Sequence, residues 1–322
     1  MLSIIIPVYN KALYLPSLIE KIISYKDSIF EFIIVNDGST DESFELLSKI
    51  NTSDSDKIKV INTENGGVSS ARNIGIENVS KKSEMIGFWD PDDDLYLDKL
   101  YDCYEVYLKE LSCSQLVIFS TINSLGVKNQ ASFIGRKYLN DEFKELYQKN
   151  IIHQCWNKIY KTKLIVENNI LFELNLDMGE DLKFNMNYLK YVEKVFFSYN
   201  ILYKYYVFNN DSLTSSYNDK SFEQFKSGIG GINDFVHSRG ISFDDINNRY
   251  IYSLNDRIRN LKKSKLKLTD QIKIFKRDFS FVNSLVHKMI PSKMSYKYKF
   301  FYFLIKFNLS NTYFFINYNF TR

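Results

Sequence analysis

The sequence has few cysteines, glycines and prolines. It contains 3 Cys, 12 Gly and 4 Pro among 322 residues. Cys103, Cys113 and Cys155 have no CxxC or Cys/His spacing, which argues against both a disulfide framework and a zinc site. Such cysteine usage fits a reducing compartment, so we predict a cytoplasmic protein.

Long apolar runs are also missing. No stretch reaches the roughly 18 apolar residues that indicate a membrane span. The N-terminus enters a strand-like run at Leu2, without the basic segment, apolar segment and cleavage site of a signal peptide. We therefore expect a chain that is neither transmembrane nor secreted by a classical signal.

The charge is unevenly distributed along the chain. Residues 257–322 contain 15 Lys and Arg against Asp270 and Asp278, a net +13, so the overall +4 leaves 4 − 13 = −9 for residues 1–256. A chain of this length predicts one large domain plus an extension. The difference in net charge between these two parts of the chain indicates that they have different partners.

The first hundred residues alternate short apolar runs with amphipathic stretches. The predicted strands are 2–8, 32–35, 58–61 and 85–89, and the predicted helices are 15–23, 43–50 and 68–78. This alternation is typical of βαβ units, so we predict an α/β fold with a mostly parallel central sheet flanked by helices. Further on, the pattern predicts a helix at 97–111, strands at 116–121, 195–197 and 201–207, and helices from about 216.

Polar residues follow each of the first four predicted strands. The segments are Pro7-Val8-Tyr9-Asn10, Asn36-Asp37-Gly38-Ser39, Asn65-Gly66-Gly67, and Trp89 with the acidic run Asp90 to Asp94. Open α/β sheets bind ligands beyond the carboxyl ends of their strands, so we expect the four segments to meet at one crevice. Each segment alone could equally be a turn, because Asp, Asn, Gly and Ser favour turns for backbone reasons.

The acidic run is the most informative segment. Asp90, Asp92, Asp93 and Asp94 place four carboxylates within five residues, and these repel one another unless a cation neutralises them. Mg²⁺ and Mn²⁺ prefer such oxygen ligands, and Mg²⁺ is usually held by one or two carboxylates together with substrate phosphates. The alternative is a solvated acidic turn that caps the next helix, a role that suits Asp94.

Taken together, the segments resemble family 2 glycosyltransferases of the GT-A fold, of the bacterial surface-polysaccharide type. The resemblance rests on six ordered segments: IIIPVYN at 4–10, IIVNDGSTD at 33–41, NGGVSSARNIG at 65–75, FWDPDD at 88–93, WNKIY at 156–160 and GEDLKF at 179–184. It covers residues 1 to about 215. We therefore expect a GT-A catalytic domain at 1–215, with a nucleotide-sugar half at about 1–112 and an acceptor half at about 113–215, and a helical extension at 216–322.

The resemblance implies roles for individual residues on the donor side. Tyr9 would stack on the nucleotide base, Asp37 would accept a hydrogen bond from it, and Arg72 would approach the base or the diphosphate. Asp90 would lie near the ribose. Asp92 and Asp93 would hold Mn²⁺ or Mg²⁺ on the diphosphate of the leaving group. The implied nucleotide-sugar set is Pro7, Val8, Tyr9, Asn10, Asp37, Gly66, Arg72, Trp89 and Asp90. From the residues alone, Tyr9 could be a packed aromatic and Asp37 a helix cap.

The resemblance also implies the catalytic base. A sugar hydroxyl needs a positioned base to take its proton as it attacks the anomeric carbon. Asp181 matches the family's base, with Glu180 beside it, and Trp156, Asn157 and Lys158 are assigned to the acceptor side. An acidic pair at a helix start is also favourable for the helix dipole. Where many relatives have Arg or His after the base, this chain has Phe208 and Asn209, so we look to Lys158 or the tail for that cation.

The basic tail combines its +13 excess with many Phe and Tyr. This pattern suits an anionic membrane surface, so a peripheral location on the inner face of the cytoplasmic membrane is one prediction. A helical subdomain that packs its aromatics and exposes its lysines explains the same pattern. Nucleic acid is disfavoured because no binding motif accompanies the charge.

The reaction implied is a single in-line displacement with inversion, from a UDP-sugar to a saccharide acceptor. The acceptor class expected is a lipid-linked capsular, exopolysaccharide or lipooligosaccharide intermediate, and the sugar a hexose or N-acetylhexosamine. A sugar-1-phosphate nucleotidyltransferase would need a Gly-rich, Arg-containing loop after the first strand, and an NAD enzyme would need GxGxxG there. Neither is present. The remaining alternative is a GT-A-like binding protein without turnover that acts in assembly of a glycan-synthesis complex.

Overall fold

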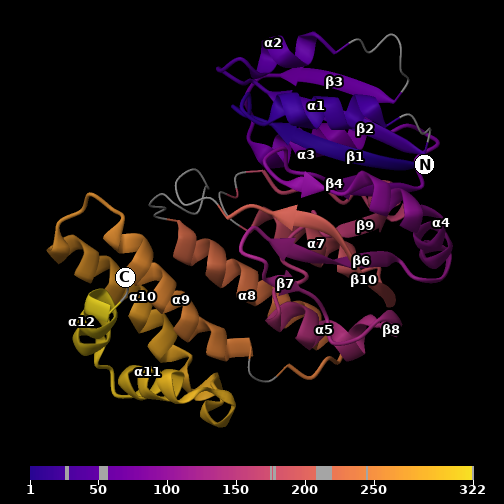
Figure 1. The fold of residues 1–322 in the computed structure, drawn as a ribbon. Helices are drawn as coiled ribbons and strands as arrows, with labels where there is room; N and C mark the ends of the chain where they lie inside the picture. The colour runs from indigo at the N-terminus through magenta and orange to yellow at the C-terminus, as the bar shows by residue number, and fades with distance from the viewer. Residues whose placement is uncertain are drawn as a thin grey trace. The chain divides into compact units, whose positions relative to one another are not determined.

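The computed structural model describes residues 1–25, 29–50, 57–174, 176, 179–207, 220–243 and 246–320. The chain separates into two units, Met1–Leu176 with Glu180–Val207 and Asp177–Gly179 with Phe208–Arg322. Figure 1 colours the first unit from indigo to salmon and the second in orange and yellow. The boundary predicted between residues 215 and 216 lies outside the described residues.

The first unit contains one large sheet with helices against it. Its strands are β1 Leu2–Val8, β2 Phe30–Asp37, β3 Ile58–Thr63, β4 Met85–Phe88, β5 Asp94–Leu95, β6 Leu116–Asn123, β7 Lys128–Asn129, β8 Gly135–Tyr138, β9 Lys158–Lys161 and β10 Lys194–Tyr205. Its helices are α1 Leu15–Ser24, α2 Ser43–Ser48, α3 Val68–Glu77, α4 Leu97–Cys113, α5 Leu139–Gln148, α6 Thr162–Glu167 and α7 Glu180–Leu189.

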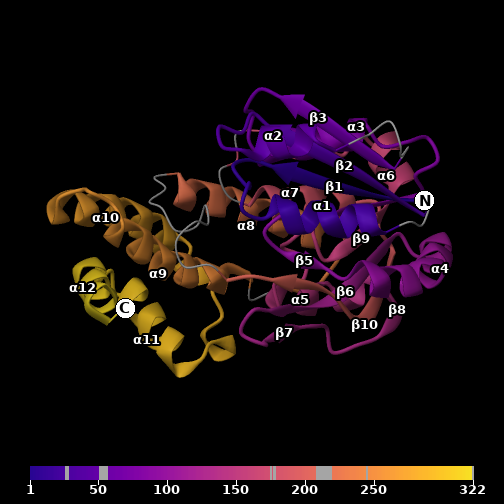
Figure 2. The same ribbon diagram turned by 45° about the horizontal axis from the view of Figure 1, so that its top comes forward.

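The strand order is β3-β2-β1-β4-β9-β6-β10-β5, with β7 beside β6 and β8 beside β10. The longer strands run in one direction, since β1 pairs in parallel with β2 and β4, β2 with β3, and β6 with β10. The short strand β9 enters antiparallel between β4 and β6. Figure 2 shows β1, β2 and β3 side by side. The carboxyl ends of β1, β2, β3 and β4 therefore lie along one edge, as predicted.

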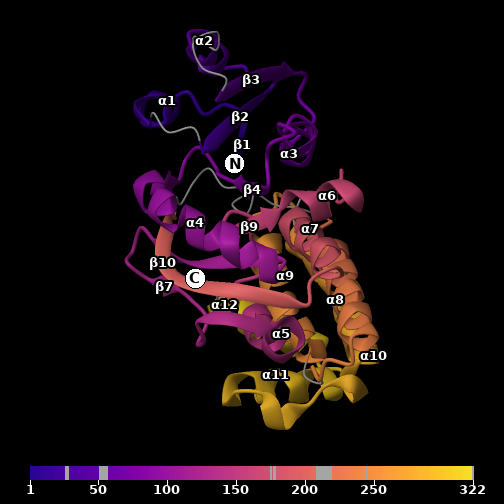
Figure 3. The ribbon, with the colours of Figure 1, turned by 90° about the vertical axis from the view of Figure 1, so that its right-hand side faces the viewer.

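Both faces of the sheet are covered by helices. On one face, α1, α2 and α4 pack apolar residues against the even-numbered side chains of β1 and β2. On the other face α3 lies so close to β1 that a Cβ at Gly75 would meet a methyl of Ile5 at 2.3 Å. In Figure 3, α1 and α4 lie on one side of the sheet and α3, α6 and α7 on the other. This layering follows from strands that are buried on both faces.

One strand prediction needs correction. The expected separate strands at 195–197 and 201–207 form the single strand β10, which pairs with β6. Its register shifts between Ser198 and Ile201 and again between Ile201 and Tyr203. These irregularities accommodate the exposed Tyr199 and Asn200, which interrupt the apolar pattern without ending the strand.

The described part of the second unit is helical. Its elements are α8 Ser221–Ser238, η3 Ile246–Asn248, α9 Arg249–Lys262, α10 Leu268–Ser284, η4 Val286–Lys288, η5 Pro291–Lys293, α11 Tyr296–Lys306 and α12 Ser310–Phe320. Aromatic and aliphatic side chains from α8 to α12 form its own core. Within that core, Arg257 on α9 and Asp278 on α10 form an ion pair at 2.9 Å. Among the described residues, no helix is both long and apolar enough to cross a bilayer.

Candidate active site

The loops after β1 and β2 are joined at the carboxyl edge of the sheet. The Asn10 side chain accepts a hydrogen bond from the backbone N–H of Thr40 at 2.8 Å, and the Ser39 hydroxyl accepts one from the backbone N–H of Asn10 at 3.1 Å. Asn10 has a φ of 52°, which Asn adopts more readily than most residues. Tyr9, its neighbour, is 46% exposed, so its ring is available to stack on a flat ligand.

Asp37 is the last residue of β2, and it contacts the turn that precedes α3. Its two carboxylate oxygens accept hydrogen bonds from the backbone N–H groups of Gly66 at 2.8 Å and Gly67 at 2.9 Å. Gly67 has a φ of 84°, and a Cβ at Gly66 would lie 2.7 Å from the Ser70 hydroxyl, so both positions favour glycine. Asp37 therefore fixes the turn before α3, whereas the alternative of a helix cap is not observed, because α3 begins without a side-chain cap hydrogen bond. A contact with a nucleotide base stays a prediction.

Three apolar residues of the predicted nucleotide-sugar set are buried in the protein core. Pro7 and Val8 lie within β1, and Trp89 is 1% exposed with its indole N–H donating to the Asp93 carbonyl at 3.0 Å. Their side chains are enclosed by the sheet and its helices, so in this structure they shape the loops beside them and present no surface to a donor.

The acidic run divides into an open carboxylate and a buried one. Asp92 is ion-paired with Lys11 at 2.6 Å, and both side chains are about a quarter exposed. Asp93 is 7% exposed, and its oxygens accept hydrogen bonds from the Tyr203 hydroxyl and the Tyr206 backbone N–H, each at 2.9 Å. Of these two carboxylates, Asp92 is therefore the one that an incoming cation can reach more directly.

The other two carboxylates of the run differ from these. Asp94 is part of the short strand β5 and pairs with Lys21 at 3.0 Å. The helix cap that suited it is not formed, because α4 begins after Tyr96 without a side-chain cap hydrogen bond. Burial raises the pKa of Asp90, and the nearby Arg72 opposes that shift. Burial also raises the pKa of Asp93 to about 8, and the charge of Asp90 adds to the effect. The run thus places carboxyl groups in a poorly solvated environment, where their charged forms are disfavoured.

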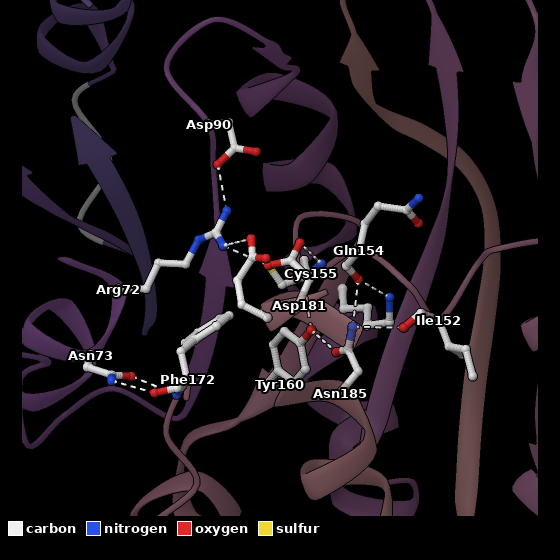
Figure 4. A network of polar contacts seen from close by, with 12 residues as sticks. Arg72, Asn73, Asp90, Ile152, Gln154, Cys155, Tyr160, Phe172, Asp181 and Asn185 are labelled. Carbon is white, nitrogen blue, oxygen red and sulfur yellow. Dashed lines mark hydrogen bonds and ion pairs between the residues drawn. The ribbon is translucent and has the colours of Figure 1, made fainter. Parts of the chain in front are cut away.

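Arg72 on α3 joins the acidic run to the predicted base (Figure 4). Its Nη2 lies 3.1 Å from Asp90, and its Nη1 lies 2.6 Å from Asp181 and 3.5 Å from Glu180. The guanidinium group is almost wholly buried and lies 5.2 Å from the centroid of the Phe172 ring. One cation thus contacts carboxylates that lie 18 and 109 residues after it in the sequence.

The Arg72 cluster, which we define as Arg72, Asp90, Glu180 and Asp181, contains more negative than positive charge. Burial alone would lower the pKa of Arg72, but the three carboxylates raise it well above its ordinary value. Its buried Nε has no hydrogen-bond partner among the residues that the structure describes. The cluster therefore combines excess negative charge with an unused donor, a combination typical of functional sites.

Glu180 and Asp181 open α7. Asp181 uses one carboxylate oxygen for Arg72, while the other accepts a hydrogen bond from the Cys155 backbone N–H at 3.0 Å. Burial raises the pKa of Glu180, and the adjacent Asp181 raises it further, whereas Arg72 lowers it. Two donors on different segments thus fix the orientation of the Asp181 carboxylate.

The segment predicted for the acceptor side has one accessible member. Trp156 stacks on Tyr203 with ring centroids 4.5 Å apart and is partly exposed. Asn157 and Lys158 are 2% and 1% exposed. Lys158 Nζ donates to the Ile151 carbonyl at 2.8 Å and to the Asn157 side chain at 2.6 Å, and burial lowers the pKa of Lys158 to about 7. Both polar side chains are thus occupied inside the protein.

A divalent metal can be tested against these side chains. No group of three or more His, Cys, Asp or Glu residues within the described ranges is arranged to hold a metal. Asp92 offers one reachable carboxylate, with Lys11 already in the position of a cation. One protein carboxylate with phosphate oxygens and water is a common shell for Mg²⁺. The residues therefore fit a metal that arrives with a diphosphate.

Residues 3–167, which are 165 of the 322, match the sequence pattern of Glycosyl transferase family 2. The chain belongs to this family. The match includes the segments after β1, β2, β3 and β4, so the resemblance read from the sequence is confirmed.

Two proteins from Bacillus subtilis are similar in sequence to about three fifths of the chain. The chain is 29% identical over 209 residues to the uncharacterized glycosyltransferase EpsJ, covering 61% of this chain and 58% of EpsJ. It is 31% identical over 204 residues to the minor teichoic acid biosynthesis protein GgaA, covering 59% of this chain and 44% of GgaA. The matches thus span about half the length of these relatives.

The fold is also that of a solved structure. Staphylococcus aureus TarS 1-349 in complex with UDP-GlcNAc superimposes with a TM-score of 0.68 at 19% identity, covering 98% of this chain and 89% of that one. At this identity the likeness concerns the fold. The predicted GT-A fold with a mostly parallel sheet and C-terminal helices is confirmed.

Several residues of this family-2 site escaped the sequence analysis. Lys11 directly follows the Tyr9-Asn10 segment, so the strand-end argument could have included it. Tyr203 and Phe172 gave no such signal, because they come from a strand interior and an irregular segment that only the fold brings to Asp93 and Arg72. The predicted departure at Phe208 and Asn209 lies outside the described residues.

Proposed function

We propose that the chain is an inverting, metal-dependent glycosyltransferase that moves a sugar from a UDP-sugar to a saccharide acceptor. The observation that carries this proposal is the Arg72 cluster. It joins Asp90, at the end of a nucleotide-side strand, to Asp181, at the start of α7. Arg72 thus contacts both a donor-side carboxylate and the candidate base. A transfer between donor and acceptor needs these two groups to lie close together.

On the donor side, Tyr9 stacks on the base and Asn10 holds the loop that presents it. Asp37 fixes the Gly66-Gly67 turn that borders the same edge. Asp90 receives the ribose. The unused Nε and the delocalised charge of Arg72 suit an anionic donor, so donor binding would redistribute the hydrogen bonds of the Arg72 cluster.

On the acceptor side, Asp181 takes the proton of the attacking hydroxyl group. The acceptor oxygen forms a bond to the anomeric carbon as the bond from that carbon to the diphosphate oxygen breaks, and the configuration inverts. Arg72 and the Cys155 N–H hold the Asp181 carboxylate for this transfer, with Glu180 beside it. Trp156 borders the acceptor, while Asn157 and Lys158 support it from inside.

The metal would be Mn²⁺ or Mg²⁺, held by Asp92, with Asp93 as the buried carboxylate behind it. Bound there, the ion would neutralise the charge that develops on the leaving UDP. Asp93 keeps the loop in place through Tyr203 and Tyr206. Lys11 balances the charge of Asp92 while no diphosphate is present.

The relatives suggest the substrate classes. Because TarS has been crystallised in complex with UDP-GlcNAc, we propose an N-acetylhexosaminyl donor, and UDP-GlcNAc is the first donor to test. Because GgaA is named for minor teichoic acid biosynthesis, we propose a surface-glycan acceptor, lipid-linked during its assembly. Catalysis would then belong to residues 1–215, and the enzyme would work in the cytoplasm, at the inner face of the membrane, with residues 257–322 as the membrane contact.

A donor screen tests the proposal. Common UDP-, GDP- and dTDP-sugars are incubated with the protein and Mn²⁺ or Mg²⁺, with and without saccharide acceptors, and nucleoside diphosphate release is measured. Release from a UDP-sugar, stopped by EDTA, is the expected result. Calorimetric binding of a UDP-sugar without any release would support the binding-protein alternative. Neither release nor binding with any donor would refute the transferase.

A further inference from the structure

The helix α11 has apolar residues on two opposite faces. Its inward residues Phe301, Leu304 and Ile305 are 4% exposed or less and belong to the core of the second unit. Its outward residues are much more exposed: Tyr296 by 90%, Phe300 by 48%, Phe303 by 50% and Phe307 by 56%. A helix of a water-soluble body normally places polar residues on its outer face, so this face requires an explanation.

The exposed rings form one continuous stripe. The spacings from Tyr296 to Phe300, Phe303 and Phe307 are four, three and four residues, which places the rings within an arc of roughly 60° on a helix of 3.6 residues per turn. The rings of Phe303 and Phe307 lie 4.5 Å apart between centroids. The apolar surface is therefore a connected patch of large side chains.

Lysines lie on both sides of the stripe. The helical spacing places Lys297 on one side of it and Lys299 and Lys306 on the other, and all three are exposed. Lys299 lies over the ring of Tyr296 at 5.2 Å. Residues 279–322 contain five Lys and one Arg and no Asp or Glu. The stripe is thus an apolar surface in a part of the chain that carries only positive charge.

We propose that this face of α11, the α11 stripe, docks on an anionic lipid bilayer. Aromatic rings settle at the level of the lipid headgroups, and lysines beside them reach the phosphates while their alkyl stems stay along the apolar layer. A second copy of the chain fits poorly, because two such faces would bring like charges together. The inference rests on the second unit alone and does not require the transfer reaction.

Vesicle flotation with the full chain tests the α11 stripe without donor or acceptor. The protein is mixed with phosphatidylcholine vesicles with and without phosphatidylglycerol. We expect it to float only with the anionic vesicles and to be released near 1 M salt, where the Debye length is about 3 Å. The variant K297A/K299A/K306A should bind roughly 100-fold more weakly, and F300S/F303S at least about tenfold more weakly.

Matched controls are available in the first unit. K81A/K82A/K163A removes the same charge, and L125S/V127S removes exposed apolar side chains; both should bind vesicles like the wild type. All the altered residues are exposed, so unchanged circular dichroism and melting temperature confirm folding. Binding equal to wild type in both α11 variants, absence of binding to anionic vesicles, or a dimer in sedimentation that F300S/F303S dissociates would each overturn the proposal.

Discussion

Two buried arginines, one in each unit, have opposite surroundings. In the second unit, Asp278 is shared by two arginines, since Arg257 and Arg277 lie 2.9 and 3.0 Å from its two oxygens. In the first unit, Arg72 is shared by three carboxylates. The first arrangement stabilises a helix pair. The second leaves negative charge in excess, which is costly unless something cationic or reactive uses it.

The difference suggests how to separate a structural ion pair from a functional one. Arg257 and Asp278 are each about 1% exposed and belong to one helix bundle. The Arg72 cluster joins distant segments, and its carboxylates are 17 to 26% exposed, so a ligand can reach them. Changes around Asp278 should therefore affect stability, and changes in the Arg72 cluster should affect turnover.

The largest effect is expected from D181N. An amide cannot accept the proton of the acceptor, so kcat should fall by about 10³-fold, while UDP-sugar binding by calorimetry stays within a few-fold of wild type. The side chain keeps its size, so the melting temperature should change little. Full turnover in this variant would contradict the assignment of Asp181 as the base.

The ion pair between Arg257 and Asp278 should behave in the opposite way, because D278N should lower stability and leave turnover unchanged. Removing this carboxylate leaves the buried Arg257 without its main counter-charge, and breaking a buried pair costs about 3–5 kcal/mol of unfolding free energy. Urea unfolding measures the loss, and activity per folded molecule should be unchanged. Loss of turnover with unchanged stability would remove the distinction between the two arginines.

The role of Arg72 can be tested by the pH dependence of kcat/KM. The Arg72 cation lowers the pKa of Glu180, which burial and Asp181 raise. In R72M the pKa of Glu180 should rise further, so the carboxylates are ionised only at higher pH. The acid limb of the kcat/KM profile should therefore move to higher pH. R72K keeps the charge and should move the limb less. Superimposable profiles for wild type, R72M and R72K would show that Arg72 does not act on these carboxylates.

The smallest effect concerns Lys11. Its ammonium group competes with a metal for Asp92, and a partly exposed pair contributes up to about 1 kcal/mol. K11M should therefore bind Mn²⁺ about two- to fivefold more tightly when no nucleotide is present, as measured by the loss of the free-ion signal in electron paramagnetic resonance. D92N is the control and should bind more weakly. Weaker binding in K11M would mean that Lys11 does not compete for this carboxylate.

The architecture was largely predictable because local patterns determine it. Leu2–Val8 is apolar throughout and is the strand β1 as predicted. The amphipathic stretches after the first two predicted strands correspond to α1 and α2 within a few residues. The region between residues 121 and 149, which gave no clear pattern, contains the short strands β7 and β8 and the helix α5. A short hairpin with β6 stabilises β7, and pairing with β10, which is far away in the sequence, stabilises β8.

The site was predictable as a set of segments, while its contacts were not. Asp90 and Asp181 followed from motifs, but no local signal indicated that Arg72 would bridge them, since it lies 109 residues before Asp181. The extent of burial also differs between residues that look alike in the sequence. Asp93 differs from Asp92 because Tyr203 and the Tyr206 N–H lie against it, and Trp89 faces the core because Asp93 provides a carbonyl for its indole.

The stereochemistry of the product tests the central claim most directly. The protein is incubated with a UDP-sugar, starting with UDP-GlcNAc, and a saccharide acceptor, and the anomeric proton of the first-formed product is followed by nuclear magnetic resonance. A single displacement with Asp181 as base predicts a product whose anomeric configuration is inverted relative to the donor. A product that retains the donor's configuration would contradict the role assigned to Asp181 and to the Arg72 cluster.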